Sequence, residues 1–460
     1  MKNSTVAAIS TPYGRGGISV VRISGENALD VAEKVFMPFS GKTLSSCDSN
    51  YAVYGKIISD GIRIDDGIAT IFRAPKSYTG EDTVEISCHG GILLTEKVLS
   101  SVFTAGAIAA GPGEFTERAF LNGKLDLSEA EAVIGLIDAE SEAKLRLSAS
   151  HASGVLKRRT DEIYNAIMRL LSSVYVSLDY PEEDLEEVSD GEFIASLKEI
   201  YTELCKTADT YREGKAVSEG IKTVLLGRPN TGKSSLLNAL LGEKRAIVTD
   251  IPGTTRDVIE EKVSIGKIIL RLSDTAGLRE SVDEVEKIGI EMAREKAENA
   301  ELVIAVFDLS TPIDDEDKAL IKKLDEFISK GKAVILALNK CDSEAGFDET
   351  KLPNGVPSVK ISAKTGEGLT ELKKTVEAMF ISGDIDYTTT AVIANARQFS
   401  AVSEAKEAVR RAIEAFESGV LADTCGLDLE KALESIGQVD GRSVAGDITD
   451  AIFHNFCVGK

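Results

Sequence analysis

Eight residues near the middle of the chain have the types and spacing of a phosphate-binding loop. Residues 227–234 read Gly-Arg-Pro-Asn-Thr-Gly-Lys-Ser, the pattern G-x-x-x-x-G-K-S. Glycines let backbone N–H groups surround an anion, the Lys233 ammonium reaches the terminal phosphates, and the Ser234 hydroxyl can ligate magnesium. An apolar, strand-like run, 221–226, precedes the loop, and a helix-like run, 235–241, follows it. This context predicts a nucleoside triphosphate site at the positive end of a helix.

Three downstream segments favour guanosine triphosphate, and each follows an apolar run that predicts a strand. Asp274-Thr275-Ala276-Gly277 offers a carboxylate to magnesium through water and an N–H to the γ-phosphate. Asn339-Lys340-Cys341-Asp342 resembles the guanine-reading segment of GTP-binding proteins, in which the carboxylate accepts from N–H groups that adenine does not offer. Ser362-Ala363-Lys364 resembles their last base-contacting loop, in which the Ala363 N–H faces the base oxygen. Together, in this order, the segments predict a GTP site.

The charge of the chain limits how it can meet nucleic acid. At 460 residues it exceeds the ~250–300 residues of a single core, so we expect several domains. Acidic residues outnumber basic ones by 75 to 53, which gives a net charge of −22. That balance argues against the chain gripping RNA by itself. If an RNA is involved, we expect a partner protein to supply most of the positive surface.

Cysteine usage and apolar runs favour a reduced cytoplasmic protein. The six cysteines include no C-x-x-C pair and no zinc spacing. No apolar run approaches the ~18 residues of a membrane helix, and no signal-like segment begins the chain, so we expect no membrane association.

Periodicity predicts a multidomain α/β plus α protein. Residues 1–120 read as an N-terminal α+β domain. Its expected strands are Val6–Ile9, Ile18–Ile23, Tyr51–Ile58, Ile68–Phe72 and Val84–Cys88, followed by a helix over Ile92–Ala105. Residues 121–217 and 382–460 read as two parts of one helical domain, which we expect to pack on each other. Residues 218–381 read as an inserted Ras-like P-loop GTPase (G) domain, with a parallel-rich sheet and helices on both faces.

Helical periodicity covers four long stretches, and two connections are expected between them and the G domain. The stretches are 128–153, 156–176, 192–212 and 395–418, with a shorter one over 427–436. Residues 214–220 read as a hinge into the G domain, and residues 382–389 as the linker that returns from it.

Further motifs extend a resemblance over essentially the whole chain. They are Thr11-Pro12-Tyr13-Gly14-Arg15-Gly16-Gly17, Val21-Arg22-Ile23-Ser24-Gly25, Thr79-Gly80-Glu81-Asp82, His89-Gly90-Gly91, Gly113-Glu114-Phe115-Thr116-Glu117-Arg118, Gly253-Thr254-Thr255-Arg256-Asp257, and Phe456-Cys457-Val458-Gly459-Lys460. With the GTP segments they resemble the MnmE (TrmE) family of bacterial tRNA-modification GTPases.

The resemblance implies a reaction and partners. Such proteins form homodimers, and with an MnmG-like FAD protein they form a heterotetramer. The complex adds an aminomethyl or carboxymethylaminomethyl group to C5 of the wobble uridine of certain tRNAs. The folate, 5-formyl- or methylene-tetrahydrofolate, supplies the one-carbon unit, and the tRNA is gripped mainly through the partner.

The resemblance also assigns the nucleotide site. The residues it implies for GTP are Asn230, Thr231, Gly232, Lys233, Ser234, Ser235, Thr249, Thr254, Thr255, Asp274, Gly277, Asn339, Lys340, Asp342, Ser362, Ala363 and Lys364. Magnesium is assigned to Ser234 and Thr255. Potassium is assigned to Asn230, Thr249, Ile251 and Thr254, in place of an arginine finger, and pairing of two G domains closes the site. For Asn230 alone, a simple turn residue is the alternative.

One catalytic assignment departs from Ras-like proteins. Leu278 occupies the position at which those proteins have the glutamine that orients the attacking water. An apolar side chain cannot orient water, so another group must do so. The resemblance assigns this role to Glu286, acting through a bridging water. The alternative is a solvated acid at a helix start.

A second set of residues is implied for folate. The resemblance assigns it to Arg22, Glu85, Lys124 and Lys460. Arginine and lysine can pair with a glutamyl carboxylate, and Glu85 can accept from the donor edge of a pterin. Ordinary surface ion pairs are the alternative. Cys457 is either a nucleophile or acid near Lys460, or a small buried side chain.

Two other functions stay open from the sequence. One is a ribosome-assembly or signalling GTPase that acts as a binding switch. The other is a folate enzyme that nucleotide merely regulates.

Overall fold

The computed structural model describes residues 4–179, 189–243, 260–273, 298–381, 383, 385–419, 424–444, 446–454 and 456–460. They belong to two compact units. The first unit comprises residues 1–134 and 433–460, and the second unit comprises residues 135–432. No helix within the described ranges combines the length and the apolarity needed to cross a membrane.

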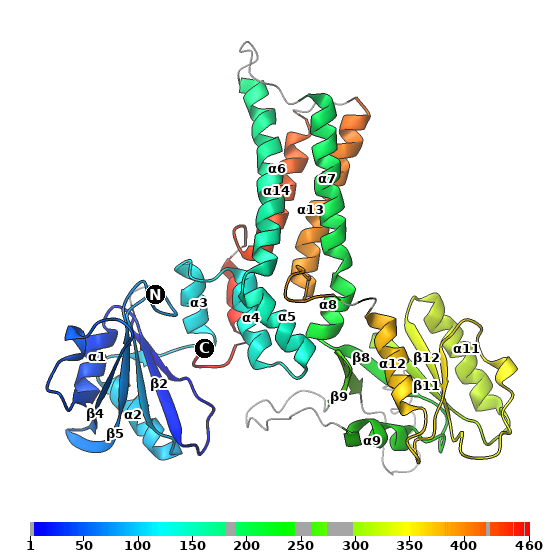
Figure 1. Cartoon of the computed structure of the whole chain (residues 1–460), viewed down its shortest axis with the longest axis horizontal. Helices are drawn as coiled ribbons and strands as arrows, with labels where there is room; N and C mark the ends of the chain where they lie inside the picture. Colours follow the sequence, from blue (N-terminus) through cyan, green and yellow to red (C-terminus); the bar gives the residue numbers. More distant parts are fainter. Residues whose placement is uncertain are drawn as a thin grey trace. The chain divides into compact units, whose positions relative to one another are not determined.

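A seven-stranded sheet forms the centre of the first unit (Figure 1). Its strand order is β3-β4-β5-β6-β2-β1-β7, with only β1 and β7 paired in parallel. The strands are β1 (Val6–Ile9), β2 (Ile18–Ser24), β3 (Phe36–Pro38), β4 (Tyr51–Ser59), β5 (Ile62–Phe72), β6 (Thr83–His89) and β7 (Ile108–Ala109). Helices α1 (Ala28–Val35) and α2 (Ile92–Thr104) join the sheet in one apolar cluster. The expected α+β fold is confirmed here.

The C-terminal segment packs within this same unit. Helix α3 (Glu114–Leu121) and the start of α4 (Leu127–Ile137) meet α15 (Gly446–Phe453) in a cluster of buried aromatic and aliphatic side chains. The Phe453 ring lies 6.1 Å from the Phe120 ring and 5.2 Å from the Phe456 ring, centroid to centroid. This packing keeps the last residues of the chain in the first unit.

The second unit contains a six-stranded sheet of order β13-β12-β11-β8-β10-β9. Only β9 and β10 pair antiparallel. The strands are β8 (Ile221–Leu226), β9 (Glu260–Ile265), β10 (Ile268–Ser273), β11 (Leu302–Asp308), β12 (Ala333–Asn339) and β13 (Ser358–Lys360). Helices α9 (Lys233–Glu243) and α12 (Leu369–Phe380) share one apolar cluster with the sheet, and α11 (Asp315–Ser329) shares another. The predicted parallel-rich sheet between helices is therefore confirmed.

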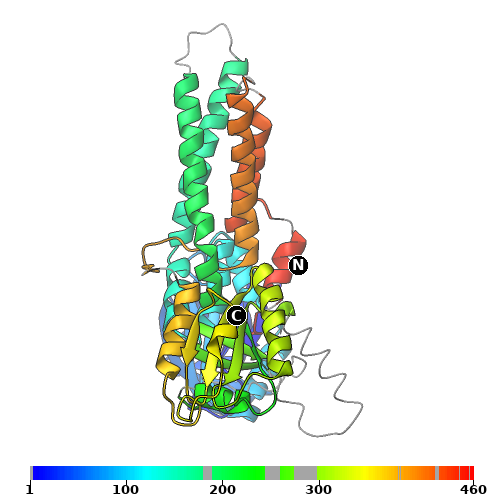
Figure 2. The same ribbon diagram turned by 90° about the vertical axis from the view of Figure 1, so that its right-hand side faces the viewer.

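Long helices make up the rest of this unit, and Figures 1 and 2 show α6, α7 and α13 running side by side. The helices are α5 (Glu142–Ala152), α6 (Val155–Asp179), α7 (Asp190–Asp209), α8 (Tyr211–Ser218), α13 (Ala396–Glu417) and the part of α14 (Gly426–Asp440) up to Ala432. All six strands of the second sheet lie between α8 and α13 in the sequence. Phe193 of α7 and Phe416 of α13 nevertheless pack with ring centroids 5.1 Å apart. The two helical stretches thus pack on each other. The exact bounds of the four predicted segments stay a prediction.

One sequence expectation was wrong in this unit, and another was refined. The expected hinge over 214–220 is largely helical, because α8 continues to Ser218. A Cβ on Gly214 would lie 2.1 Å from the Ile393 carbonyl oxygen, so this glycine permits a close backbone approach rather than bending. The predicted helical stretch over 128–153 forms two helices, α4 and α5, and the Ser141 side chain accepts from the Lys144 N–H and caps α5.

Candidate functional site

The phosphate loop joins β8 to α9 and has backbone angles that few residue types tolerate. Asn230 has φ 63°, and Gly232 has φ 95°. A Cβ on Gly232 would lie 2.2 Å from the Asn339 Nδ2 atom, and one on Gly227 would lie 2.5 Å from the Val306 carbonyl oxygen. Glycine is therefore required at both positions, as the pattern predicted.

Lys233 begins α9 and turns back across the loop. Its Nζ donates to the carbonyl oxygens of Gly227 at 2.8 Å and Arg228 at 2.7 Å. Burial lowers the pKa of Lys233, and Glu316 acts weakly in the other direction. The hydroxyl-bearing Ser234 and Ser235 follow it and are exposed. The ammonium thus lies at the helix start where phosphates are expected.

Asn339 connects the phosphate loop to the predicted base-contacting loop. It ends β12 and is 3% exposed. Its Nδ2 donates to the Thr231 carbonyl oxygen at 2.7 Å, and its Oδ1 accepts from the Ala363 N–H at 2.9 Å. The Ala363 N–H was expected to face the base oxygen. A bound guanine must therefore share this N–H with Asn339 or replace Asn339 as its acceptor. Asn339 brings together segments more than a hundred residues apart in the chain.

The rest of the base-contacting region lies at the same sheet edge. Ser362 is fully buried, and its hydroxyl accepts from the Thr365 N–H at 3.1 Å. The Cys341 N–H donates to the Ile361 carbonyl oxygen at 3.1 Å, which joins the two loops directly. Asp342 is exposed, so its carboxylate is open to a ligand.

Two side chains that support this site were not predicted. Asp308 ends β11 and accepts from the Lys340 Nζ at 2.5 Å and from the Ser310 hydroxyl at 2.6 Å. Burial alone would raise the pKa of Asp308, but these hydrogen bonds outweigh it and hold the pKa below its usual range. Arg228 anchors the phosphate loop by donating to the Asp314 carboxylate at 2.9 Å. The sequence signal for Asp308 is an acidic residue directly after the apolar run 302–307, and the structure adds that it lies beside Asn339.

Several predicted residues lie outside the described residues. These are Thr249, Ile251, Thr254, Thr255, Asp274, Gly277 and Glu286. Within the described ranges, no group of three or more His, Cys, Asp or Glu side chains is placed to hold a metal ion. The exposed Ser234 hydroxyl is the described group that fits magnesium in this site.

The residues predicted for folate lie in the first unit. Arg22 and Glu85 are cross-strand partners on β2 and β6, and the Arg22 Nε donates to the Glu85 Oε1 at 2.8 Å. The two charged groups therefore lie in contact at one place on the sheet. The Arg22 guanidinium carbon lies 5.4 Å from the ring centroids of both Tyr78 and Phe115, neither of which was predicted.

The other predicted members approach from separate segments. The Lys124 Nζ donates to the Pro75 carbonyl oxygen at 3.1 Å. The backbone oxygen of Lys460 accepts from the Phe115 N–H at 3.2 Å, at the start of α3. Cys457 is an exposed free thiol, so the alternative of a buried structural cysteine was wrong.

Comparisons with known proteins cover the whole chain. A family model described as "GTP-binding protein TrmE N-terminus" matches residues 5–124, and one described as "MnmE helical domain" matches residues 127–457. The tRNA modification GTPase MnmE of Clostridioides difficile (strain 630) is 41% identical over 461 residues, covering 100% of this chain and 99% of the relative. The chain belongs to the MnmE family.

Other relatives agree with this assignment. The tRNA modification GTPase MnmE of Lachnoclostridium phytofermentans is 44% identical over 467 residues and is covered completely, as is this chain. Among solved structures, the G domain of the T. maritima FeoB iron transporter is 31% identical and covers 34% of this chain and 97% of its own, with a TM-score of 0.24. Because that TM-score is low, the fold is assigned from the strand order of this chain instead.

Proposed function

We propose that the chain couples GTP hydrolysis to the modification of C5 of the wobble uridine of certain tRNAs, in the cytoplasm. Membership of the MnmE family makes it a GTP-hydrolysing enzyme of tRNA modification. The proposal adds the group transferred, which is aminomethyl or carboxymethylaminomethyl, and the folate that donates its one-carbon unit. It also adds a homodimer and an MnmG-like FAD partner that contributes most of the tRNA grip.

The observation that carries the nucleotide-binding part of the proposal is the position of Asn339. Its two hydrogen bonds join the phosphate loop to the Ser362–Lys364 loop in a chain that aligns end to end with MnmE relatives. A site that links phosphate binding and base reading in this way supports recognition of a whole guanine nucleotide. The net charge of −22 supports a partner that supplies positive surface to tRNA.

The nucleotide-site residues have separate roles in binding GTP under this proposal. Lys233 leaves the loop carbonyls and pairs with the terminal phosphates, while Ser234 holds magnesium together with Thr255. The Asp342 carboxylate accepts from the guanine N–H groups. Asp308 binds the Lys340 ammonium and so holds the Lys340 side chain in place at the base. Magnesium supplies charge neutralisation at the phosphates when bound.

Potassium and Glu286 complete the proposed hydrolysis site. The exposed Asn230 amide makes no hydrogen bond within the described residues, which supports a role in holding a cation. Thr249, Ile251 and Thr254 are the other proposed ligands, and G-domain pairing would exclude water from the cation and the γ-phosphate. We expect GTP turnover to be faster in potassium than in sodium, and equal rates would contradict this part of the proposal. Glu286→Ala should retain GTP binding and lose most hydrolysis.

Exposed apolar side chains in the first unit support pairing of two copies. Ile18, Ile62 and Leu93 are 68%, 68% and 73% exposed. Ile62 and Leu93 border a hollow of about 1060 Å³. Apolar exposure of this kind marks interaction surfaces.

Analysis of tRNA from a deletion strain tests the proposal against its alternative. We expect wobble uridines without the C5 group and normal ribosomal particles. Normal wobble uridines together with defective ribosomal particles would instead favour a ribosome-assembly switch.

A further inference from the structure

Arg22 is held in the first unit between two aromatic rings that come from different segments. Tyr78 belongs to the loop between β5 and β6, and Phe115 belongs to α3. Both ring centroids lie 5.4 Å from the guanidinium carbon. Phe115 is fully buried, and the Tyr78 hydroxyl bonds to the Thr116 hydroxyl at 2.9 Å. The direction of Arg22 therefore depends on how this loop and this helix are fixed.

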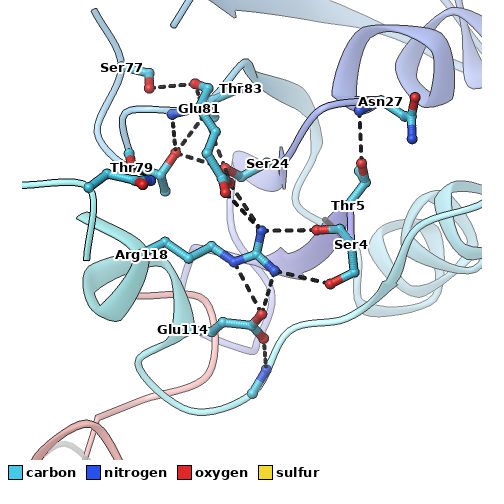
Figure 3. Close-up of polar contacts among 12 residues, drawn as sticks. Ser4, Thr5, Ser24, Asn27, Ser77, Thr79, Glu81, Thr83, Glu114 and Arg118 are labelled. Atoms are coloured by element: carbon cyan, nitrogen blue, oxygen red, sulfur yellow. Dashed lines mark hydrogen bonds and ion pairs between the residues drawn. The ribbon is translucent and has the colours of Figure 1, made fainter. Parts of the chain in front are cut away.

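Arg118 lies in α3, four residues after Glu114, and joins this helix to the same loop (Figure 3). Its Nη1 donates to both carboxylate oxygens of Glu81 at 3.1 Å, and its Nη2 donates to the Glu114 Oε1 at 2.7 Å. Its Nη1 also donates to the Ser4 carbonyl oxygen at 2.9 Å, just before β1. Arg118 is 8% exposed and the side chains of its partners Glu81 and Glu114 are 20% and 25% exposed, so these bonds are largely shielded from bulk water. One guanidinium thus connects three segments.

Each acidic partner lies close in sequence to one of the rings. Glu114 directly precedes Phe115, and its other oxygen accepts from the Gly111 N–H at 2.8 Å. Glu81 lies three residues after Tyr78 and accepts from the Ser24 hydroxyl at 2.8 Å. Each carboxylate therefore holds in place the segment that carries one of the rings.

The cost of burying these charges argues for a positional role. Two carboxylates share one arginine, and the desolvation of buried ions cancels much of their attraction. Apolar side chains of similar volume could hold the segments together as well. The forked guanidinium differs because it fixes directions as well as contacts.

We propose that Arg118 is a positioning residue for Arg22, acting through Glu81 and Glu114 on the Tyr78 and Phe115 rings. It keeps the Arg22–Glu85 pair aimed at one end of a ligand. Only the identity of that ligand, a tetrahydrofolate, rests on the function proposed above.

Arg118→Lys tests this inference because it keeps the charge and removes the fork. We expect 5-formyltetrahydrofolate to bind the full-length variant about tenfold more weakly, the equivalent of about one well-placed hydrogen bond. We also expect faster modification of Arg22 by phenylglyoxal, measured by peptide mass spectrometry without ligand. Arg63→Lys is the matched control, since Arg63 pairs with Asp66 and is 53% exposed.

A second background separates positioning from stability. In Tyr78→Leu/Phe115→Leu, adding Arg118→Lys should change the Kd less than about twofold, because the rings through which it acts are gone. A purely structural role predicts a lower Tm in Arg118→Lys with unchanged Kd and unchanged labelling of Arg22, and that result would overturn the proposal. Full additivity in the ring-deficient background would overturn it as well.

The two proposals can fail separately. If the wild-type chain does not bind 5-formyltetrahydrofolate, the folate function fails, and the labelling of Arg22 still decides whether Arg118 positions it. If Arg118→Lys does not fold, Glu114→Gln replaces it, since it keeps the side-chain size and weakens the same connection. Unchanged labelling in Glu114→Gln would then count against the inference.

Discussion

Replacing Asn339 with alanine should strongly weaken GTP binding, although Asn339 lies more than a hundred residues after the phosphate loop in the sequence. The substitution removes the bonds to the Thr231 carbonyl and the Ala363 N–H, at 2.7 and 2.9 Å. Each buried bond lost costs ~1–2 kcal/mol once its partner is left unsatisfied, or ~2–4 kcal/mol for both. Because the bound nucleotide must order both loops without this support, the cost falls on GTP affinity. This corresponds to a roughly 30- to 1000-fold increase in Kd.

Titration with a fluorescent GTP analogue measures this change. Asn354→Ala is the matched control, because Asn354 lies in an exposed turn of the same unit and should leave the Kd unchanged. Thermal unfolding of both variants shows how much of the cost falls on the fold instead. An Asn339→Ala Kd within twofold of wild type, with an unchanged Tm, would refute the reasoning that Asn339 couples the two loops.

Four further changes have defined outcomes. Gly232→Ala should abolish measurable binding of the same analogue, because its Cβ would lie 2.2 Å from Asn339 Nδ2 at a φ of 95°; binding within threefold of wild type would contradict the loop geometry. Asp308→Asn should destabilise the chain by about 2 kcal/mol at pH 7, the cost of a charge-assisted bond. Since the folded-state pKa of Asp308 is depressed, this difference should persist above about pH 4 and shrink as pH falls below it, in urea unfolding across pH. Removal of magnesium with EDTA should stop hydrolysis, and Ser234→Ala should need more magnesium for half-maximal rate.

Two strands of the second sheet were closely predictable from the sequence, because their apolar runs end where the strands end. β8 coincides with the run 221–226, and β12 extends one residue beyond the run 333–338, whereas β9 and β11 were not predicted. The polar segments that follow strands therefore meet at one sheet edge, as parallel pairing requires. The role of Asp308 was not predictable in this way, because it depends on the register that sets Asp308 beside Asn339.

The folate residues illustrate the same limit in the first unit. Their side chains were assigned by resemblance, but the pairing of Arg22 with Glu85 follows from the register of β2 and β6. Tyr78 and Phe115 lie in segments with no periodic pattern that points to Arg22. Gly214 was misread for a related reason, since only the approach of Ile393 explains a glycine inside a helix.

We propose above that GTP hydrolysis at the site formed by the phosphate loop and the base-contacting loops drives tRNA modification. Mass spectrometry of wobble uridines in a deletion strain complemented with wild type, Lys233→Ala or Arg63→Lys tests it most directly. We predict that wild type and Arg63→Lys restore the C5 group, and that Lys233→Ala does not although the protein is present at the same level. Full restoration of the C5 group by Lys233→Ala would contradict the claim.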